Sequence, residues 1–226
     1  MYTLIFVLLL TAVPAFFVYA SSSVRAGIYL RLFCRRKTDR KVIALTFDDG
    51  PDPMQTPKIL KVLRERHVSA CFFCIGSKVK GHEELLRQII KEGHAVGNHS
   101  FSHSACFPLY GFRRMCRDLT TCRQTLEKVT GRPVQWFRPP FGVTNPTLAR
   151  AVRHLGYTPI GWNIRTLDTL QPAPEKIIRR IRKRLTPGSV LLLHDRMPHS
   201  DRLLVQILEL LEEEGYRVVA LEELLK

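Results

Sequence analysis

Apolar and polar positions alternate along most of the chain with two different periods. Short, almost fully apolar runs are typical of buried strands, and stretches with an apolar residue at every third or fourth position are typical of amphipathic helices. The apolar runs span 42–47, 70–75, 95–98, 134–138, 157–162, 189–194 and 216–220, and the helical patterns span 57–66, 83–92, 113–129, 174–185 and 201–214. Because strand and helix alternate, we predict an α/β fold with a parallel sheet, an irregular (β/α) barrel of about seven strands.

The first twenty residues differ from the rest, because they carry no charged side chain and are rich in Leu, Val and Phe. That length and composition fit a membrane-spanning helix. The sequence Val18-Tyr19-Ala20 followed by serines also fits a signal-peptidase site, which leaves a cleaved signal as the alternative. Because the segment lacks a basic start and is long for a signal core, we expect an anchor over 1–22, a basic juxtamembrane linker over 23–40 and one folded domain over 41–226.

The chain is strongly basic, with a formal net charge of +15. Residues 24–41 contain seven Lys or Arg against one Asp, which favours contact with anionic lipid head groups. A second basic run, 176–184, alternates with Ile in an amphipathic pattern whose charged face is expected to be solvated, or else to meet a membrane or an anionic glycan. No recognition motif accompanies the charge, so we expect no nucleic-acid partner, and the oligomeric state stays open.

Two of the six cysteines, Cys71 and Cys74, invite a redox or zinc interpretation. They lie in an apolar strand pattern at a spacing that places them on opposite faces of the strand. We therefore expect buried free thiols.

Acidic, basic and imidazole side chains follow the apolar runs at four places. Asp48 and Asp49 end the first run, before the turn Gly50-Pro51. Two adjacent carboxylates at the end of a buried strand need a cation or a shared proton, although such a turn taken alone is more often simply solvated. His99 and His103, four residues apart, can reach one side of a turn or loop and bind one divalent ion.

The other two places are weaker when taken singly. Arg138 opens the stretch Arg138-Pro139-Pro140-Phe141-Gly142, whose prolines hold the backbone rigid. His194 ends the apolar run before it, as structural histidines often do. All four places lie at the carboxyl ends of predicted strands, where the active sites of (β/α) barrels are found.

In this order the motifs resemble those of the polysaccharide deacetylases, the NodB-homology domain of carbohydrate esterase family 4. The resemblance covers roughly residues 41–225, so the domain over 41–226 is expected to be NodB-like. It rests on residues 46–51, 99–103, 138–142 and 191–194, with Trp162 and Asp168. The resemblance implies metal ligands at Asp49, His99 and His103.

The resemblance also implies the remaining roles. Asp48 would be the general base and His194 the general acid. Arg138 would orient Asp48, and Asp168 would support the charged form of His194. The substrate would meet Pro139, the backbone amide of Phe141, which would help to hold the oxyanion, and Trp162 in the sugar pocket. One departure is that Thr169 follows Asp168, where many family members have Trp, so one aromatic wall is missing or comes from elsewhere.

These groups suffice to hydrolyse an amide. A divalent ion, expected to be Zn with Co, Ni or Mn as alternatives, polarises the carbonyl and lowers the pKa of water. A carboxylate then takes a proton from the water, and an imidazole protonates the departing amine. We expect a metal-dependent hydrolase that removes N-acetyl groups from the amino sugars of an N-acetylated glycan such as peptidoglycan or a chitin-like polymer.

Two other functions remain possible on the sequence. One is a deacylase or deformylase of a lipid-linked or small amide, which the apolar first segment makes credible. The other is an inactive glycan-binding module, disfavoured because ligands, base and acid are all present. The positive-inside rule would place the domain in the cytoplasm. The family resemblance favours a membrane-anchored, extracytoplasmic enzyme of the cell envelope, or a secreted one after cleavage.

Overall fold

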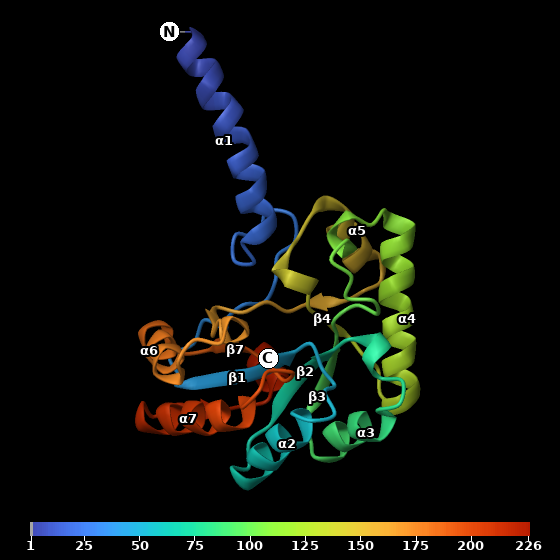
Figure 1. Cartoon of the computed structure of the whole chain (residues 1–226), viewed down its shortest axis with the longest axis vertical. Helices are drawn as coiled ribbons and strands as arrows, with labels where there is room; N and C mark the ends of the chain where they lie inside the picture. The colour runs from blue at the N-terminus through green and yellow to red at the C-terminus, as the bar shows by residue number, and fades with distance from the viewer. Residues whose placement is uncertain (1) are drawn as a thin grey trace.

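The computed structural model describes the backbone of residues 2–226 and the side chains of residues 11–226 (Figure 1). One parallel sheet organises the domain, in the order β5-β4-β3-β2-β1-β7-β6, with β8 paired to β1. The strands are β1 (Val42–Asp48), β2 (Ala70–Cys74), β3 (Ala95–Asn98), β4 (Trp136–Phe137), β5 (Thr158–Pro159), β6 (Ile164–Arg165), β7 (Ser189–His194) and β8 (Arg217–Val218).

The predicted parallel α/β fold is confirmed, and the sheet curls without closing. The outer strands β5 and β6 do not pair with each other within the described residues. Each predicted apolar run contains a strand, but β4, β5 and β8 are only two residues long. The pattern did not predict β6, because two residues are too few to show a period.

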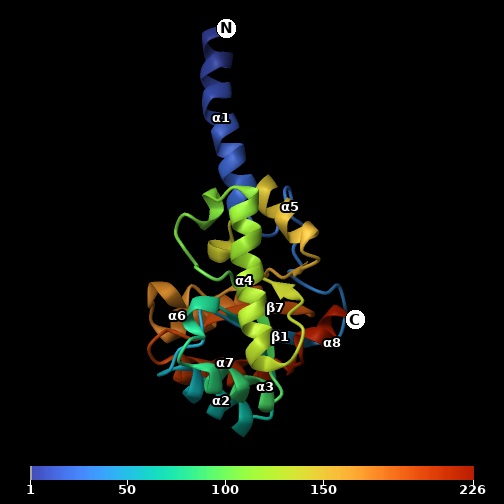
Figure 2. The same ribbon diagram turned by 90° about the vertical axis from the view of Figure 1, so that its right-hand side faces the viewer.

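Helices cover the outer face of the sheet in a continuous row. In space the order is α6, α7, α2, α3, α4 and α5, each contacting the next, and α4 runs along one side of the domain (Figure 2). Their bounds are α1 (Tyr2–Ser22), α2 (Thr56–Glu65), α3 (Glu83–Lys91), α4 (Phe112–Thr130), α5 (Pro146–His154), α6 (Pro174–Arg184), α7 (Ser200–Glu213) and α8 (Leu221–Leu225). The five predicted helices are present, whereas α5 and the short α8 were not predicted.

Local signals explain why α5 forms. Asn145 precedes the helix and its side chain accepts a hydrogen bond from the backbone N–H of Leu148, while Pro146 occupies the first helical position. Both residues favour a helix start, because they satisfy or remove amide donors that have no partner within the first turn.

The two faces of the central strands pack into different parts of the core. On β1, Ile43, Leu45 and Phe47 face the helices, and Ala44 faces the interior of the curled sheet. Cys74 belongs to the first cluster and Cys71 to the second, and both are free. The expectation of buried thiols on opposite faces is therefore confirmed.

The segment between α1 and β1, expected as a linker, packs on the domain. Leu30 and Leu32 are buried beside α4 and α5 residues. The Phe33 N–H donates to the carbonyl of Pro159, and the Phe33 carbonyl accepts from Gly161. A hydrogen bond also joins Arg36 to Gly188. Much of this basic stretch is thus a structural part of the domain.

Helix α1 rises from the domain as a single apolar helix (Figure 1). Within the described part of the chain, no helix is both long and apolar enough to span a membrane. The anchor expected over 1–22 falls partly on residues 1–10, whose side chains lie outside the described residues.

A truncation of one buried side chain tests the contribution of the segment between α1 and β1. Leu32→Ala should reduce the free energy of unfolding by about 2–5 kcal/mol, because it removes a buried leucine from a packed cluster. The urea midpoint of the purified protein measures the change. Leu109→Ala is the matched control, since Leu109 is 84% exposed and should change stability by less than about 0.5 kcal/mol. Equal midpoints for both variants would contradict the structural role of this segment.

Candidate active site

The site lies where β1 and β7 end side by side. Asp48 is the last residue of β1 and is in register with His194, the last residue of β7. Asp49 follows with φ of 76°, a left-handed conformation that is uncommon for non-glycine residues. This turn of the backbone separates the two adjacent carboxylates, so that Asp48 meets Arg138 and Asp49 meets the histidine pair.

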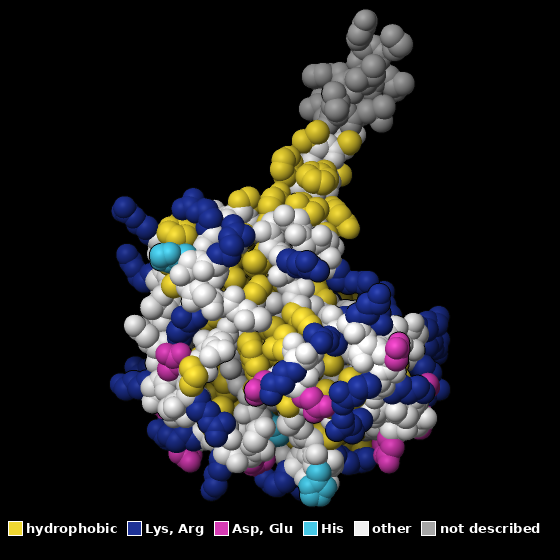
Figure 3. Space-filling model, turned by 180° about the vertical axis from the view of Figure 1, so that it is seen from behind, with side chains coloured by type: hydrophobic (Ala, Val, Ile, Leu, Met, Phe, Trp, Pro, Cys, Tyr) yellow, Lys and Arg dark blue, Asp and Glu magenta, His cyan; other side chains and the backbone are white. Residues whose placement is uncertain are grey.

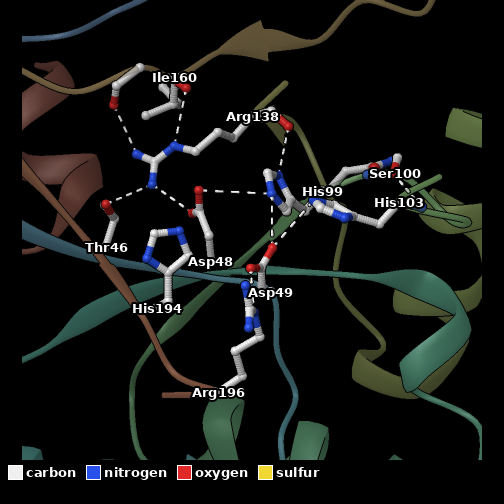
Figure 4. A network of polar contacts seen from close by, with 12 residues as sticks. Thr46, Asp48, Asp49, His99, Ser100, His103, Arg138, Ile160, His194 and Arg196 are labelled. Carbon is white, nitrogen blue, oxygen red and sulfur yellow. Dashed lines mark hydrogen bonds and ion pairs between the residues drawn. The ribbon is translucent and has the colours of Figure 1, made fainter. Parts of the chain in front are cut away.

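A hydrogen-bonded loop after β3 brings the two imidazoles together. The Asn98 side chain accepts from the Ser100 N–H at 2.8 Å, and the Ser100 hydroxyl accepts from the His103 N–H at 3.0 Å. Ser100 and His103 both have positive φ. The Nε2 atoms of His99 and His103 then lie 3.5 Å and 3.3 Å from Asp49 Oδ1 (Figure 4).

These three side chains fit a divalent cation. Their candidate ligand atoms all lie within 4.8 Å of one another. Nε2 of His103 is buried and makes no hydrogen bond among the described residues. His99 Nδ1 lies 2.9 Å from the Arg138 carbonyl, which can only accept, so Nδ1 carries the proton and Nε2 keeps a lone pair for a metal.

The pKa shifts of Asp49 and His103 also favour metal binding. Burial, reinforced by the neighbouring His99, lowers the pKa of His103 to about 4, so its imidazole is neutral near neutral pH. Burial alone would raise the pKa of Asp49, but hydrogen bonding and charge from His99, together with Arg196, hold it well below its usual range. A carboxylate and a neutral imidazole are ligands that need lose no proton to bind a metal.

Arg138 is fully buried, and every part of its guanidinium is hydrogen-bonded. Nη1 donates to Asp48 Oδ1 at 2.7 Å and to the Thr46 hydroxyl at 2.8 Å. Nη2 and Nε donate to the carbonyls of Gly161 and Ile160. The contact at Asp48 leaves Oδ2 on the side of His99, whose Nε2 is 3.8 Å away.

His194 is paired with Asp168 on the other side of Asp48. Asp168 Oδ1 lies 2.8 Å from His194 Nδ1, and Oδ2 accepts the His194 backbone N–H at 2.8 Å. Burial would lower the pKa of His194, but the Asp168 carboxylate raises it above its ordinary value. The family-based pairing of Asp168 with His194 is present in the structure. Thr169 contributes its backbone N–H to Asp168, at 3.1 Å.

The predicted substrate contacts differ in exposure. Phe141, inside the short helix η3 (Pro140–Gly142), has φ of 60° and is 50% exposed, with its ring 4.7 Å from that of His103. Pro139 is buried just before η3.

Trp162 is only 8% exposed and lies beneath Gly142, where a β-carbon added to the glycine would approach the indole ring to 2.6 Å. The Trp162 ring is 5.6 Å from the Arg138 guanidinium.

Sequence reasoning missed three polar groups around Asp49. Arg196 Nε donates to Asp49 Oδ2 at 2.7 Å, and Lys78 Nζ donates to the Asp49 carbonyl at 2.7 Å. Asp195 is fully buried beneath this turn and accepts from the Thr56 hydroxyl. Burial raises the pKa of Asp195 to about 7. The position of Asp195 and Arg196 directly after His194 was the available signal.

Comparison with known proteins agrees with this geometry. Residues 35–160 match the family described as polysaccharide deacetylase. A peptidoglycan-N-acetylglucosamine deacetylase of Bacillus cereus is 35% identical, over 83% of this chain and 90% of its own. A chitooligosaccharide deacetylase of Azorhizobium caulinodans is 36% identical, over 69% of this chain and 74% of its own.

A solved structure shows the same fold. It is a CE4 family pseudoenzyme from Bacillus anthracis, with a TM-score of 0.79 and 26% identity, covering 85% of this chain and 68% of the other. Sequence match, fold and the arrangement of Asp, His and Arg side chains all agree, and the chain belongs to the polysaccharide deacetylase family of amide-hydrolysing enzymes.

Proposed function

We propose that this enzyme removes N-acetyl groups from the amino sugars of a polysaccharide, such as peptidoglycan or a chitin-like glycan. The observation that carries the proposal is the position of Asp48 and His194. The strand-end register places them side by side, next to three side chains that fit a metal. The printed names of the relatives, a peptidoglycan and a chitooligosaccharide deacetylase, support the substrate class.

Asp48 is proposed as the general base. Arg138 fixes one of its oxygens, and the other lies 3.8 Å from the metal-facing nitrogen of His99, close to the expected position of the attacking water. A divalent metal held by Asp49, His99 and His103, proposed to be Zn with Co, Ni or Mn as alternatives, would lower the pKa of that water and polarise the acetyl carbonyl.

His194 is proposed as the general acid, because Asp168 favours the protonated imidazole that must donate to the departing amine. The Phe141 ring lies 4.7 Å from that of His103, and the backbone N–H of this residue is proposed to stabilise the negative charge that develops on the carbonyl oxygen. The exposed Phe141 ring would border the sugar, with the buried Pro139 holding the backbone that precedes it.

The activity itself can be measured as acetate release from N-acetylglucosamine oligomers and from purified peptidoglycan. We expect release from at least one of them, loss of activity after metal chelation, and recovery after a divalent metal is restored. A metal-loaded, folded protein that releases acetate from neither polymer would contradict the proposed substrate class.

The metal assignment predicts a specific loss of binding. His103→Ala should weaken Zn²⁺ affinity by at least about 100-fold, since loss of an outer-shell partner alone often costs 10–100-fold. Titration calorimetry of the metal-free protein measures the affinity without an activity assay. His154→Ala, an exposed histidine on α5, should bind like the parent. Equal affinities for both variants would remove His103 from the ligand set.

Substitutions of the two adjacent carboxylates should have opposite effects on metal binding. Asp48→Asn should keep the metal but lower turnover by about 10²–10⁴-fold, because the amide can still accept from Arg138 but cannot take a proton. Asp49→Asn should lose metal affinity. Metal content and acetate release, measured on both variants with circular dichroism as the folding control, test the assignment. Metal loss in Asp48→Asn alone would mean that the two roles are exchanged.

The pairing of His194 with Asp168 predicts a change in pH dependence. A general acid must be protonated, so the rate falls as pH rises through the pKa of His194, which Asp168 raises. Asp168→Asn removes that effect, and the high-pH limb of the rate profile should move to lower pH. Titration of the His194 ring by NMR should show the same direction. Thr169→Ala keeps the backbone N–H to Asp168 and should leave both curves unchanged; an unmoved limb in Asp168→Asn would exclude the pairing.

A further inference from the structure

Large apolar side chains are exposed in only two places among the side chains that the structure describes. One is α1 with the residues that follow it, and the other is the set of loops at the carboxyl ends of the strands. None lies on α2 to α8. The residues are Val13, Phe16, Phe17, Val18, Tyr19 and Ile28 in the first place, and Met54, Leu109, Phe141 and Leu170 in the second.

The four loop residues follow strands of the sheet that carries the active site at its carboxyl edge. Met54 follows β1, Leu109 follows β3, Phe141 follows β4 and Leu170 follows β6. Because all paired strands are parallel, these loops emerge at the edge of the sheet that carries the catalytic groups. Single exposed apolar residues are ordinary on protein surfaces. Together the four form an apolar rim on this edge of the sheet, with Leu109 at 84% and Leu170 at 73% exposure.

Helix α1 is attached to the same edge. Its last turns are fixed to the domain, since Ala20 is buried and the Thr144 N–H donates to the Ser21 carbonyl at 2.8 Å. Thr144 lies three residues after Phe141. Val24, just beyond α1, packs with the interior cluster that includes Trp162. The base of α1 therefore has a defined position beside the loop that borders the site.

Positive charge accompanies these apolar groups. Arg25 lies exposed just after α1, Arg113 and Arg114 follow Leu109, and Arg196 is exposed beside Asp49. Lys and Arg side chains also lie near the base of α1 on the face that Figure 3 shows. Apolar and aromatic groups ringed by basic side chains are characteristic of surfaces that lie in the interface of an anionic bilayer.

We propose that the rim residues Met54, Leu109 and Leu170, together with α1, form a docking face for an anionic phospholipid bilayer, while Phe141 remains at the substrate site. The active-site mouth then lies at the head-group level, with α1 inserted beside it. This inference goes beyond the proposed deacetylation, because it concerns where the site is held and not what it hydrolyses. A protein partner is less well matched, since the rim is discontinuous and its surroundings are positively charged.

The contact can be mapped with tryptophans placed on the full chain. Leu109→Trp and Leu170→Trp introduce a fluorophore at the rim, and Gln135→Trp introduces one at an exposed position before β4, at the opposite end of the sheet. Vesicles contain phosphatidylglycerol and bromine-labelled phosphatidylcholine. With Trp136 and Trp162 present in all variants, the rim tryptophans should shift to the blue on binding and be quenched about twofold more than the Gln135→Trp control.

Two results would overturn the proposal. The protein could fail to bind the vesicles, or it could bind while both rim tryptophans remain as water-exposed as the Gln135→Trp control, which would mean that α1 alone tethers the domain. Neither result depends on catalysis, so neither bears on the deacetylase proposal.

Charge variants test the electrostatic part separately. Arg113→Gln should weaken binding to anionic vesicles about fivefold, the effect of about one surface charge. Lys128→Gln, exposed near the other end of α4, should bind like the parent. Equal weakening by both would show that overall charge, and not this face, governs binding.

Discussion

The fully buried guanidinium of Arg138 is the constraint on which the site depends. A buried cation is costly unless it is paired and fully hydrogen-bonded. Here the Asp48 carboxylate, the Thr46 hydroxyl and two carbonyls before Trp162 supply those partners. The arginine thereby ties β1 to β4 and to the loop after β5. Removing one member of such a pair commonly costs about 3–5 kcal/mol, because the other charge is left buried alone.

This arrangement also explains how two neighbouring carboxylates can serve different purposes. Asp48 continues the strand and meets Arg138, whereas the left-handed backbone at Asp49 turns the second carboxylate toward His99 and His103. Arg196 and Lys78 bond Asp49 from outside the ligand set, at its second oxygen and at its carbonyl. The strained backbone is therefore held by several independent hydrogen bonds, as strained functional residues generally are.

Much of the fold and the site could be predicted because both depend on short-range patterns. The alternation of strand and helix patterns predicted the parallel sheet. The ends of two predicted strands carry Asp48 and His194, which are in register in the structure. The groups that could not be predicted depend on contacts between distant parts of the chain. Arg196 reaches Asp49 across 147 positions, and Leu32 packs against α4 and α5. Neither contact leaves a periodic signal, and the one local sign of Arg196 is its position two residues after His194.

The fold by itself does not determine activity in this family, since a protein with the same architecture is described as a pseudoenzyme. Activity must then depend on individual side chains and their protonation. In this chain the ligand set, Asp48 and the pair of His194 with Asp168 occur together. The pKa values of two histidines shift in opposite directions, down at His103 and up at His194. One imidazole is thus kept free to bind a metal, and the protonated form of the other is favoured, which is the division of roles that amide hydrolysis requires.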